Sequence, residues 1–457
     1  MTRLLLKNAL LVATQDEQLK EVPGGDVLID GQVICEIKKN IEAPADETID
    51  VSGCLVVPGF VNTHHHLYQV LTRNLRKSQD AKLFDWLVYH YDVWRHISAS
   101  EVRAAAQAGL GELLLSGCTC SADHHYLFPD GVEDDLFEVE VQAAAELGIR
   151  LQPTRGSMSL GKSKGGLPPD SVIQTEDKIL KDSQRVIEKF HDPAEFSMCR
   201  VALAPCSPFS VSDELMRQTA ELARQHGVRL HTHLAETLDE ENFCIERFGK
   251  RPVAYAEELG WLGPDVWFAH CVHLNQAEIQ KLSETGTGVA HCPVSNLRLG
   301  SGIAPVPQML QAKVPVGLAV DGSASNDSSN MLRELQTALL IHRVGTGVEA
   351  MPARTVLQIA TRGGARVLGR DDIGCLAPGQ AADLAVFDLQ GLAYSGARHD
   401  PVAALLFCGL DLRAQIVIVN GELVVRDKQL IRVDENQISV QADRASQRLL
   451  QAAGVIS

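Results

Sequence analysis

Eight apolar runs alternate with longer amphipathic stretches through the middle of the chain. The runs end at His64, Asp123, Thr154, Pro205, His233, His270, His291 and Asp321. Between most of them, apolar residues recur with helical spacing, for example in 101–115, 135–147, 213–225 and 276–284. Short apolar runs predict buried strands, and the longer periodic stretches predict helices. Eight repeats of this alternation are typical of an α/β protein with a (β/α)8 TIM barrel, whose active site lies at the carboxyl ends of the strands.

The two ends of the chain carry a different pattern. In 26–34 two short apolar runs flank Asp30-Gly31, and in 415–425 two more flank Asn420-Gly421. Such turns between apolar runs predict β-hairpins, and 383–388 predicts another strand. We interpret the ends as one small β-sandwich with the barrel inserted into it. The predicted domains are 1–59 plus 370–434 for the sandwich, 60–369 for the barrel and 435–457 for a C-terminal helix.

Aromatic residues gather in the segment 81–99, which follows the first predicted strand. They are Phe84, Trp86, Tyr89, Tyr91 and Trp94. The pattern allows two interpretations, a helix that packs its apolar face on the barrel and a mobile lid over the site.

Composition narrows the class of partner. The chain of 457 residues has a net charge of -16, which repels phosphates and argues against nucleic acid and anionic membranes as partners. No apolar run reaches the length of a membrane span, and the first residues lack the features of a signal peptide. Eleven cysteines at irregular spacing are typical of reduced thiols. We therefore expect a cytoplasmic protein.

Polar residues at four strand ends form a candidate metal site. His64 and His66 are two residues apart, so their side chains point to the same side of an extended chain. His233 ends the fifth run and Asp321 the eighth. Three imidazoles and a carboxylate suit Zn²⁺, and Fe²⁺ or Mn²⁺ are also compatible. A lone histidine is more often a core residue, but this set predicts a hydrolytic metal centre.

Two further residues have the spacing of proton carriers. Glu236 lies three residues beyond His233, where it can reach the reacting water as a general acid and base without being a ligand. His270 ends the neighbouring strand and can polarise a substrate or stabilise negative charge. The structural alternatives are a surface carboxylate and a buried histidine.

The same fragments resemble the amidohydrolase superfamily, in its branch of mononuclear aminohydrolases that act on purines, pyrimidines, pterins and triazines. The matching stretches span essentially the whole chain: 58–66 (PGFVNTHHH), 231–236 (HTHLAE), 269–271 (AHC), 291–296 (HCPVSN), 321–323 (DGS) and 376–384 (LAPGQAADL). Within the branch, 64–69 (HHHLYQ), 123–126 (DHHY) and 155–158 (RGSM) are most similar to 8-oxoguanine deaminases.

The resemblance implies roles for the candidate residues. His64, His66, His233 and Asp321 correspond to the metal ligands, while Glu236, His270 and, in a second role, Asp321 correspond to the groups that move protons. Binuclear relatives use a carboxylated lysine after the fourth strand. Because 204–209 reads APCSPF, without lysine, we expect one metal ion.

The implied activity is hydrolytic deamination of an oxidised or amino-substituted purine, 8-oxoguanine to urate plus ammonia, in purine metabolism. The motifs leave open deamination or dechlorination of guanine, isocytosine, a pterin or an s-triazine. A catalytically silent scaffold of the same fold is the remote alternative, although such proteins usually lose ligands and none is lost here.

A small heterocycle is the expected partner, and a homo-oligomer is compatible with the sequence. Four residues are candidate substrate contacts: Gln69 for a ring edge, Trp86 for stacking, and His124 and Arg155 for an oxygen. The alternative for each is a structural hydrogen bond or core packing.

Overall fold

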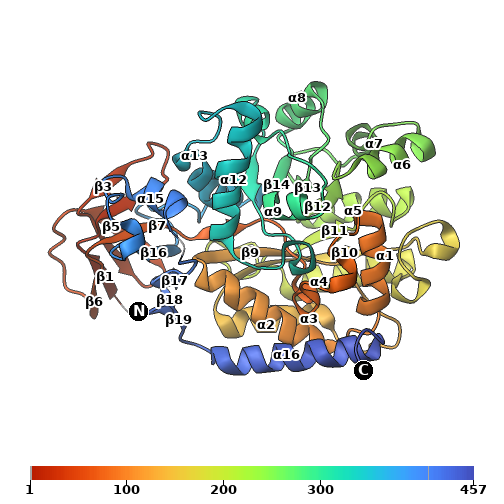
Figure 1. Cartoon of the computed structure of the whole chain (residues 1–457), viewed down its shortest axis with the longest axis horizontal. Coiled ribbons are helices and arrows are strands. Elements are labelled where there is room, and N and C mark those ends of the chain that lie inside the picture. The colour runs from red at the N-terminus through yellow and green to blue at the C-terminus, as the bar shows by residue number, and fades with distance from the viewer. Residues whose placement is uncertain (1–2, 410) are drawn as a thin grey trace.

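A closed barrel of eight parallel strands forms the centre of the computed structural model, which describes residues 3–409 and 411–457 (Figure 1). Neighbouring strands follow chain order from β8 to β15. The backbone N–H of Thr63 donates to Leu318 O at 3.1 Å, which joins the last strand to the first. The TIM barrel is thereby confirmed. Its strands are β8 (Phe60–Asn62), β9 (Cys118–His125), β10 (Arg150–Ser157), β11 (Ala202–Pro205), β12 (Arg229–Leu234), β13 (Val266–His270), β14 (Gly288–His291) and β15 (Val316–Leu318).

Four strand ends differ from the prediction by two or three residues: β9 and β10 run on beyond the predicted Asp123 and Thr154, and the other two lie where the barrel closes. β8 and β15 stop at Asn62 and Leu318, before the predicted ends at His64 and Asp321. The side chain of Asn62 accepts a hydrogen bond from the Val320 N–H at 2.9 Å, so a side chain replaces the regular ladder there. His64 and Asp321 therefore lie in the loops just beyond the strands.

Helices surround the barrel and agree closely with the periodic stretches. Polar side chains cap their first turns, for example Ser98 before α2 and Ser212 before α5. The helices between barrel strands are α1 (Leu83–Trp94), α2 (Ala99–Leu115), α3 (Leu136–Leu147), α4 (Glu176–Phe190), α5 (Asp213–His226), α6 (Leu238–Phe248), α7 (Pro252–Glu258), α8 (Gln276–Thr285), α9 (Pro293–Arg298) and α10 (Val306–Gln311). After the barrel come α11 (Ser323–Asn326), α12 (Met331–Thr346), α13 (Ala353–Gln358), α14 (Gly364–Val367), α15 (Pro401–Phe407) and α16 (Glu435–Ala452).

Two further sheets pack face to face at one side of the barrel (Figure 1). The smaller contains β1 (Arg3–Lys7), β4 (Asp26–Asp30), β5 (Val33–Lys38) and β6 (Glu47–Asp50). The larger contains β2 (Leu11–Ala13), β3 (Glu21–Pro23), β7 (Cys54–Pro58), β16 (Leu384–Asp388), β17 (Ile416–Val419), β18 (Glu422–Arg426) and β19 (Gln429–Leu430). Antiparallel pairing of β7 with β16 joins the two ends of the chain in that sheet.

The C-terminal helix α16 lies along α2 and contacts α1 (Figure 1). Arg448 forms an ion pair with the buried Glu101 at 2.7 Å, and Ser446 donates to Leu71 O at 2.6 Å. Within the described ranges, no helix has the length and apolar character that a bilayer span requires.

Candidate metal centre

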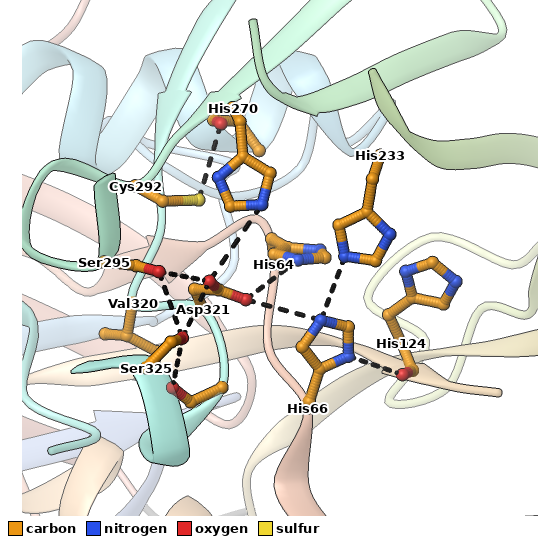
Figure 2. Close-up of polar contacts among 12 residues, drawn as sticks. His64, His66, His124, His233, His270, Cys292, Ser295, Val320, Asp321 and Ser325 are labelled. Carbon is orange, nitrogen blue, oxygen red and sulfur yellow. Dashed lines mark hydrogen bonds and ion pairs between the residues drawn. The ribbon is translucent and has the colours of Figure 1, made fainter. Parts of the chain in front are cut away.

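The predicted ligands meet at the carboxyl ends of the barrel strands (Figure 2). His64 and His66 follow β8, His233 lies in β12, and Asp321 lies beyond β15. His64, His66 and Asp321 are each at most 4% exposed, although they come from distant parts of the chain. The fold therefore brings together the four residues predicted from strand ends.

Hydrogen bonds behind two of the rings fix which nitrogen carries the proton. His66 Nδ1 lies 2.8 Å from His124 O, and His233 Nδ1 lies 2.6 Å from Cys206 O. A carbonyl oxygen only accepts, so each Nδ1 must be the protonated donor. Burial lowers the pKa of both rings, which keeps them neutral. Each Nε2 is consequently an unprotonated lone pair.

His64 reaches the same state through a second histidine. His231 Nδ1 donates to Trp267 O at 2.9 Å, so its Nε2 is an acceptor, and His64 Nδ1 donates to that atom at 2.7 Å. This chain leaves His64 Nε2 without a hydrogen-bond partner. The third imidazole thus also presents a lone pair.

These lone pairs face one another and a carboxylate. The Nε2 atoms of His66 and His233 are 3.1 Å apart, and Asp321 Oδ1 lies 3.2 Å from His64 Nε2 and 3.3 Å from His66 Nε2. Acceptors at such distances repel unless a cation lies between them. Zinc binds nitrogen and oxygen at about 2.0–2.2 Å, which gives tetrahedral ligand atoms a separation of about 3.3 Å. The residues therefore fit one divalent metal ion.

Two serines orient the carboxylate. Ser295 and Ser325 donate to Asp321 Oδ2 at 2.5 and 3.0 Å, which leaves Oδ1 for the metal side (Figure 2). Burial acts to raise the pKa of Asp321, but the close contact with the His64 ring and the charge of His270 outweigh it and hold that pKa well below the usual range. Asp321 is therefore an anion.

Glu236 and His270 lie beside the ligands. His270 Nδ1 donates to Asn296 Oδ1 at 2.9 Å, and its Nε2 lies 3.6 Å from Glu236 Oε2 and 4.0 Å from Asp321 Oδ2. Burial raises the pKa of Glu236. Burial acts to lower the pKa of His270, but the charges of Glu236 and Asp321 outweigh it and raise that pKa. His270 therefore lies beside two carboxylates that favour its protonated form.

A small cavity opens over this cluster. Gln69 and Trp86, two of the predicted substrate contacts, line it together with Glu236, His270 and Asp321. Helix α1 contributes further apolar lining through Leu83, Leu87 and Tyr91. The aromatic segment therefore forms a wall of the cavity, and its side chains Trp86, Tyr91 and Trp94 are buried.

The other two predicted contacts do not reach the cavity. Arg155 points outward from β10, where it pairs with Asp182 at 2.7 Å and donates to Gln174 at 2.6 Å. His124 lies against the histidine cluster and donates from Nε2 to Ala204 O at 2.9 Å. The placement corrects both expectations. Every residue of β9 and β10 is buried, so the sequence does not show which alternate side chains face inward.

Sequence reasoning also missed several supporting residues. His231, Ser295 and Ser325 touch ligands rather than the cavity floor, and the carbonyl of Cys206 acts through its backbone. The sequence could have indicated His231, because it lies two residues before His233, the same spacing as between His64 and His66. Cys206 lines the cavity, but burial raises the pKa of its thiol to about 12, so the thiol stays protonated.

Residues 55–424 match the model of the amidohydrolase family. The chain is 49% identical over 430 residues to an 8-oxoguanine deaminase of Pseudomonas aeruginosa, covering 93% of this chain and 94% of that one. It is 36% identical to an isoxanthopterin deaminase of an unknown prokaryotic organism, covering 98% and 97%.

Solved structures of related proteins have the same fold. An atrazine chlorohydrolase of Arthrobacter aurescens complexed with zinc superposes with a TM-score of 0.93 at 35% identity, covering 97% of this chain and 100% of that one. An adenosine deaminase of Xanthomonas campestris with bound zinc gives 0.89 at 25%, covering 98% of each. The fold therefore recurs in two enzymes that were crystallised with zinc.

Proposed function

The chain belongs to the amidohydrolase family, and on this basis we propose that it is a metal-dependent aminohydrolase of small heterocycles. Its proposed substrate is 8-oxoguanine, which hydrolysis of the exocyclic C–N bond converts to urate and ammonia. That substrate would place the protein in purine metabolism, and its eleven free cysteines support a reducing, cytoplasmic setting.

One observation carries the proposal: three lone pairs and a carboxylate converge beside a buried glutamate at the floor of a cavity. A structural core would not accumulate buried acceptors that face one another. A silent scaffold would not need Glu236 and His270 next to them. The identity of 49% with an 8-oxoguanine deaminase favours that purine over the other heterocycles.

We propose that His64, His66, His233 and Asp321 hold one divalent metal, with zinc favoured by the donor set and by the zinc-containing structural neighbours. When bound, such an ion lowers the pKa of a coordinated water from about 15.7 to about 7. The Nδ1 hydrogen bonds described above hold the three rings in the orientation that this binding needs.

Glu236 is the proposed general acid and base. Its carboxylate takes a proton from the attacking water and passes it to a ring nitrogen of the substrate, and its raised pKa suits both steps. Asp321 takes the second proton and delivers it to the leaving amine. His270, held by Asn296, stabilises the negative charge that develops during attack.

Recognition of the ring is proposed for Gln69 and Trp86. Gln69 Oε1 is buried and has no hydrogen-bond partner, so it can accept from an N–H on the substrate. Trp86 offers an aromatic surface at the cavity wall.

Ammonia release from a panel of heterocycles tests the proposal. Metal-replete protein should act on 8-oxoguanine faster than on guanine, isocytosine, a pterin or an aminotriazine. Glu236→Gln should lower kcat by about 10²–10⁴ while the metal content stays unchanged. Faster turnover of a triazine than of 8-oxoguanine would make the triazine the proposed substrate. Full activity of Glu236→Gln would refute the role of Glu236.

A further inference from the structure

We propose that Glu240 is a positioning residue that holds the Ala235–Glu236 backbone and thereby aims the Glu236 carboxylate. This inference rests on the function proposed above, because it assumes that Glu236 moves protons. Glu240 does not line the cavity and touches none of the predicted ligands. Its effect on the reaction would pass through the backbone alone.

Glu240 is bound to this backbone through both carboxylate oxygens. Oε1 accepts from the Ala235 N–H at 2.7 Å, and Oε2 accepts from the Glu236 N–H at 2.8 Å. The side chain is only 1% exposed. Hydrogen bonds of this length from two successive amides fix the peptide plane between them, from which the Glu236 side chain projects.

The backbone held by Glu240 is in an unfavourable conformation. Ala235 has φ +55°, a left-handed value that a residue with a Cβ rarely adopts. On the opposite side, the carbonyl of Ala235 accepts from the His273 N–H at 2.9 Å. Such strain persists where surrounding bonds determine the conformation, and it is common at functional sites.

A comparison within the chain shows that Glu240 departs from the usual role of its position. Thr237 caps α6 and Glu240 is three residues later, the spacing of a capping box. In the equivalent box at α8, Glu278 returns to the N–H of the cap residue, Asn275, at 2.9 Å. Glu240 instead reaches past Thr237 to the two residues before it. The ordinary capping function therefore does not account for its contacts.

Four variants separate positioning from general stability. Glu240→Gln keeps the shape but replaces one acceptor oxygen by an amide N–H donor, and Glu240→Asp keeps both acceptor oxygens but shortens the reach. Ala235→Gly removes the strain, and it is combined with Glu240→Gln. The control is Glu241→Gln, because Glu241 lies next in the same helix turn and pairs with Arg251 rather than with the backbone of 235–236.

Glu240→Gln and Glu240→Asp should lower kcat by about 10–100-fold, as expected when a reacting group is displaced by about 1 Å. KM and metal content should stay within about twofold of the parent, because neither the ligands nor the cavity lining changes. Glycine at 235 should restore a substantial part of kcat in the Glu240→Gln background. Glu241→Gln should behave as the parent.

Hydrogen exchange supplies a readout independent of turnover. The amides of Ala235 and Glu236, followed in peptides covering 234–240, should exchange faster in Glu240→Gln than in Glu241→Gln. Unchanged exchange, a kcat equal to that of the control, or a loss that glycine does not relieve would each overturn the positioning role. Parent protein that is inactive on every heterocycle, with exchange altered as expected, would refute the proposed function instead.

Discussion

Replacing His231 by phenylalanine removes the acceptor that fixes the tautomer of His64. His231 Nε2 accepts from His64 Nδ1 at 2.7 Å, and both side chains are fully buried. Phenylalanine preserves the ring that stacks on Trp267, where the centroids are 4.3 Å apart. The substitution therefore deletes this hydrogen bond and the one that His231 Nδ1 donates to Trp267 O at 2.9 Å, with little change in packing.

Loss of this acceptor should destabilise the metal-bound protein more than the metal-free protein. With metal on Nε2, the proton of His64 must stay on Nδ1, which in the variant has no partner. A buried donor without a partner costs about 1–3 kcal/mol. In metal-free protein, the proton can move to Nε2 and be donated to Asp321 Oδ1, which lies 3.2 Å away. Since about 1.4 kcal/mol is a factor of ten, we expect metal to bind about 10–100-fold more weakly.

Competition against a chromophoric chelator measures this change directly, with metal content by elemental analysis and with thermal unfolding of the metal-free forms. His342→Phe is the matched control, because His342 is also buried and its Nε2 lies 3.0 Å from His291 Nε2, outside the predicted ligand set. Equal metal affinity of His231→Phe and the parent, or an equal loss in both variants, would refute the tautomer reasoning.

Three further outcomes are expected. A Cβ at Gly322 would lie 1.9 Å from Gln69 Oε1, so Gly322→Ala should displace the amide and raise KM about tenfold in steady-state assays, with kcat less affected; an unchanged KM would exclude Gln69 as a contact. Burial raises the pKa of Glu140 to about 8 from 4.5. The folded state thus keeps a proton that the unfolded chain releases, and the free energy of unfolding should fall between those pH values by at most about 1.4 kcal/mol per pH unit. In Glu140→Gln, urea unfolding at pH 5, 6.5 and 8 should show a shallower decline, and equal declines would contradict the shift. Chelation should lower Tm by removing about 2.7 kcal/mol or more of binding energy at metal concentrations above 100 times Kd, and an unchanged Tm would argue against a metal in the folded protein.

The strand ends made the barrel and the metal cluster predictable from the sequence. His64, His66, His233 and Asp321 could be found because parallel strands bring their carboxyl ends to one mouth. Arg155 could not be placed in the same way. Both faces of a barrel strand are buried, so apolar pattern alone does not distinguish the side that faces the centre from the side that faces the helices.

Supporting contacts were harder still to predict. The roles of Ser295 and Ser325 depend on loop geometry around Asp321, and that of Cys206 depends on a backbone carbonyl that any residue could supply. The residue types at these positions therefore do not indicate that such contacts form.

The pairing of β7 with β16 has a consequence for synthesis of the chain. Val57 pairs with Ala385, so a ribosome must translate more than 300 further residues before β7 acquires this neighbour. Until then, one edge of β7, immediately before the first barrel strand, presents unpaired backbone groups that can pair with other chains. A chain truncated before β16 would retain that open edge and should aggregate even though every barrel strand has been made.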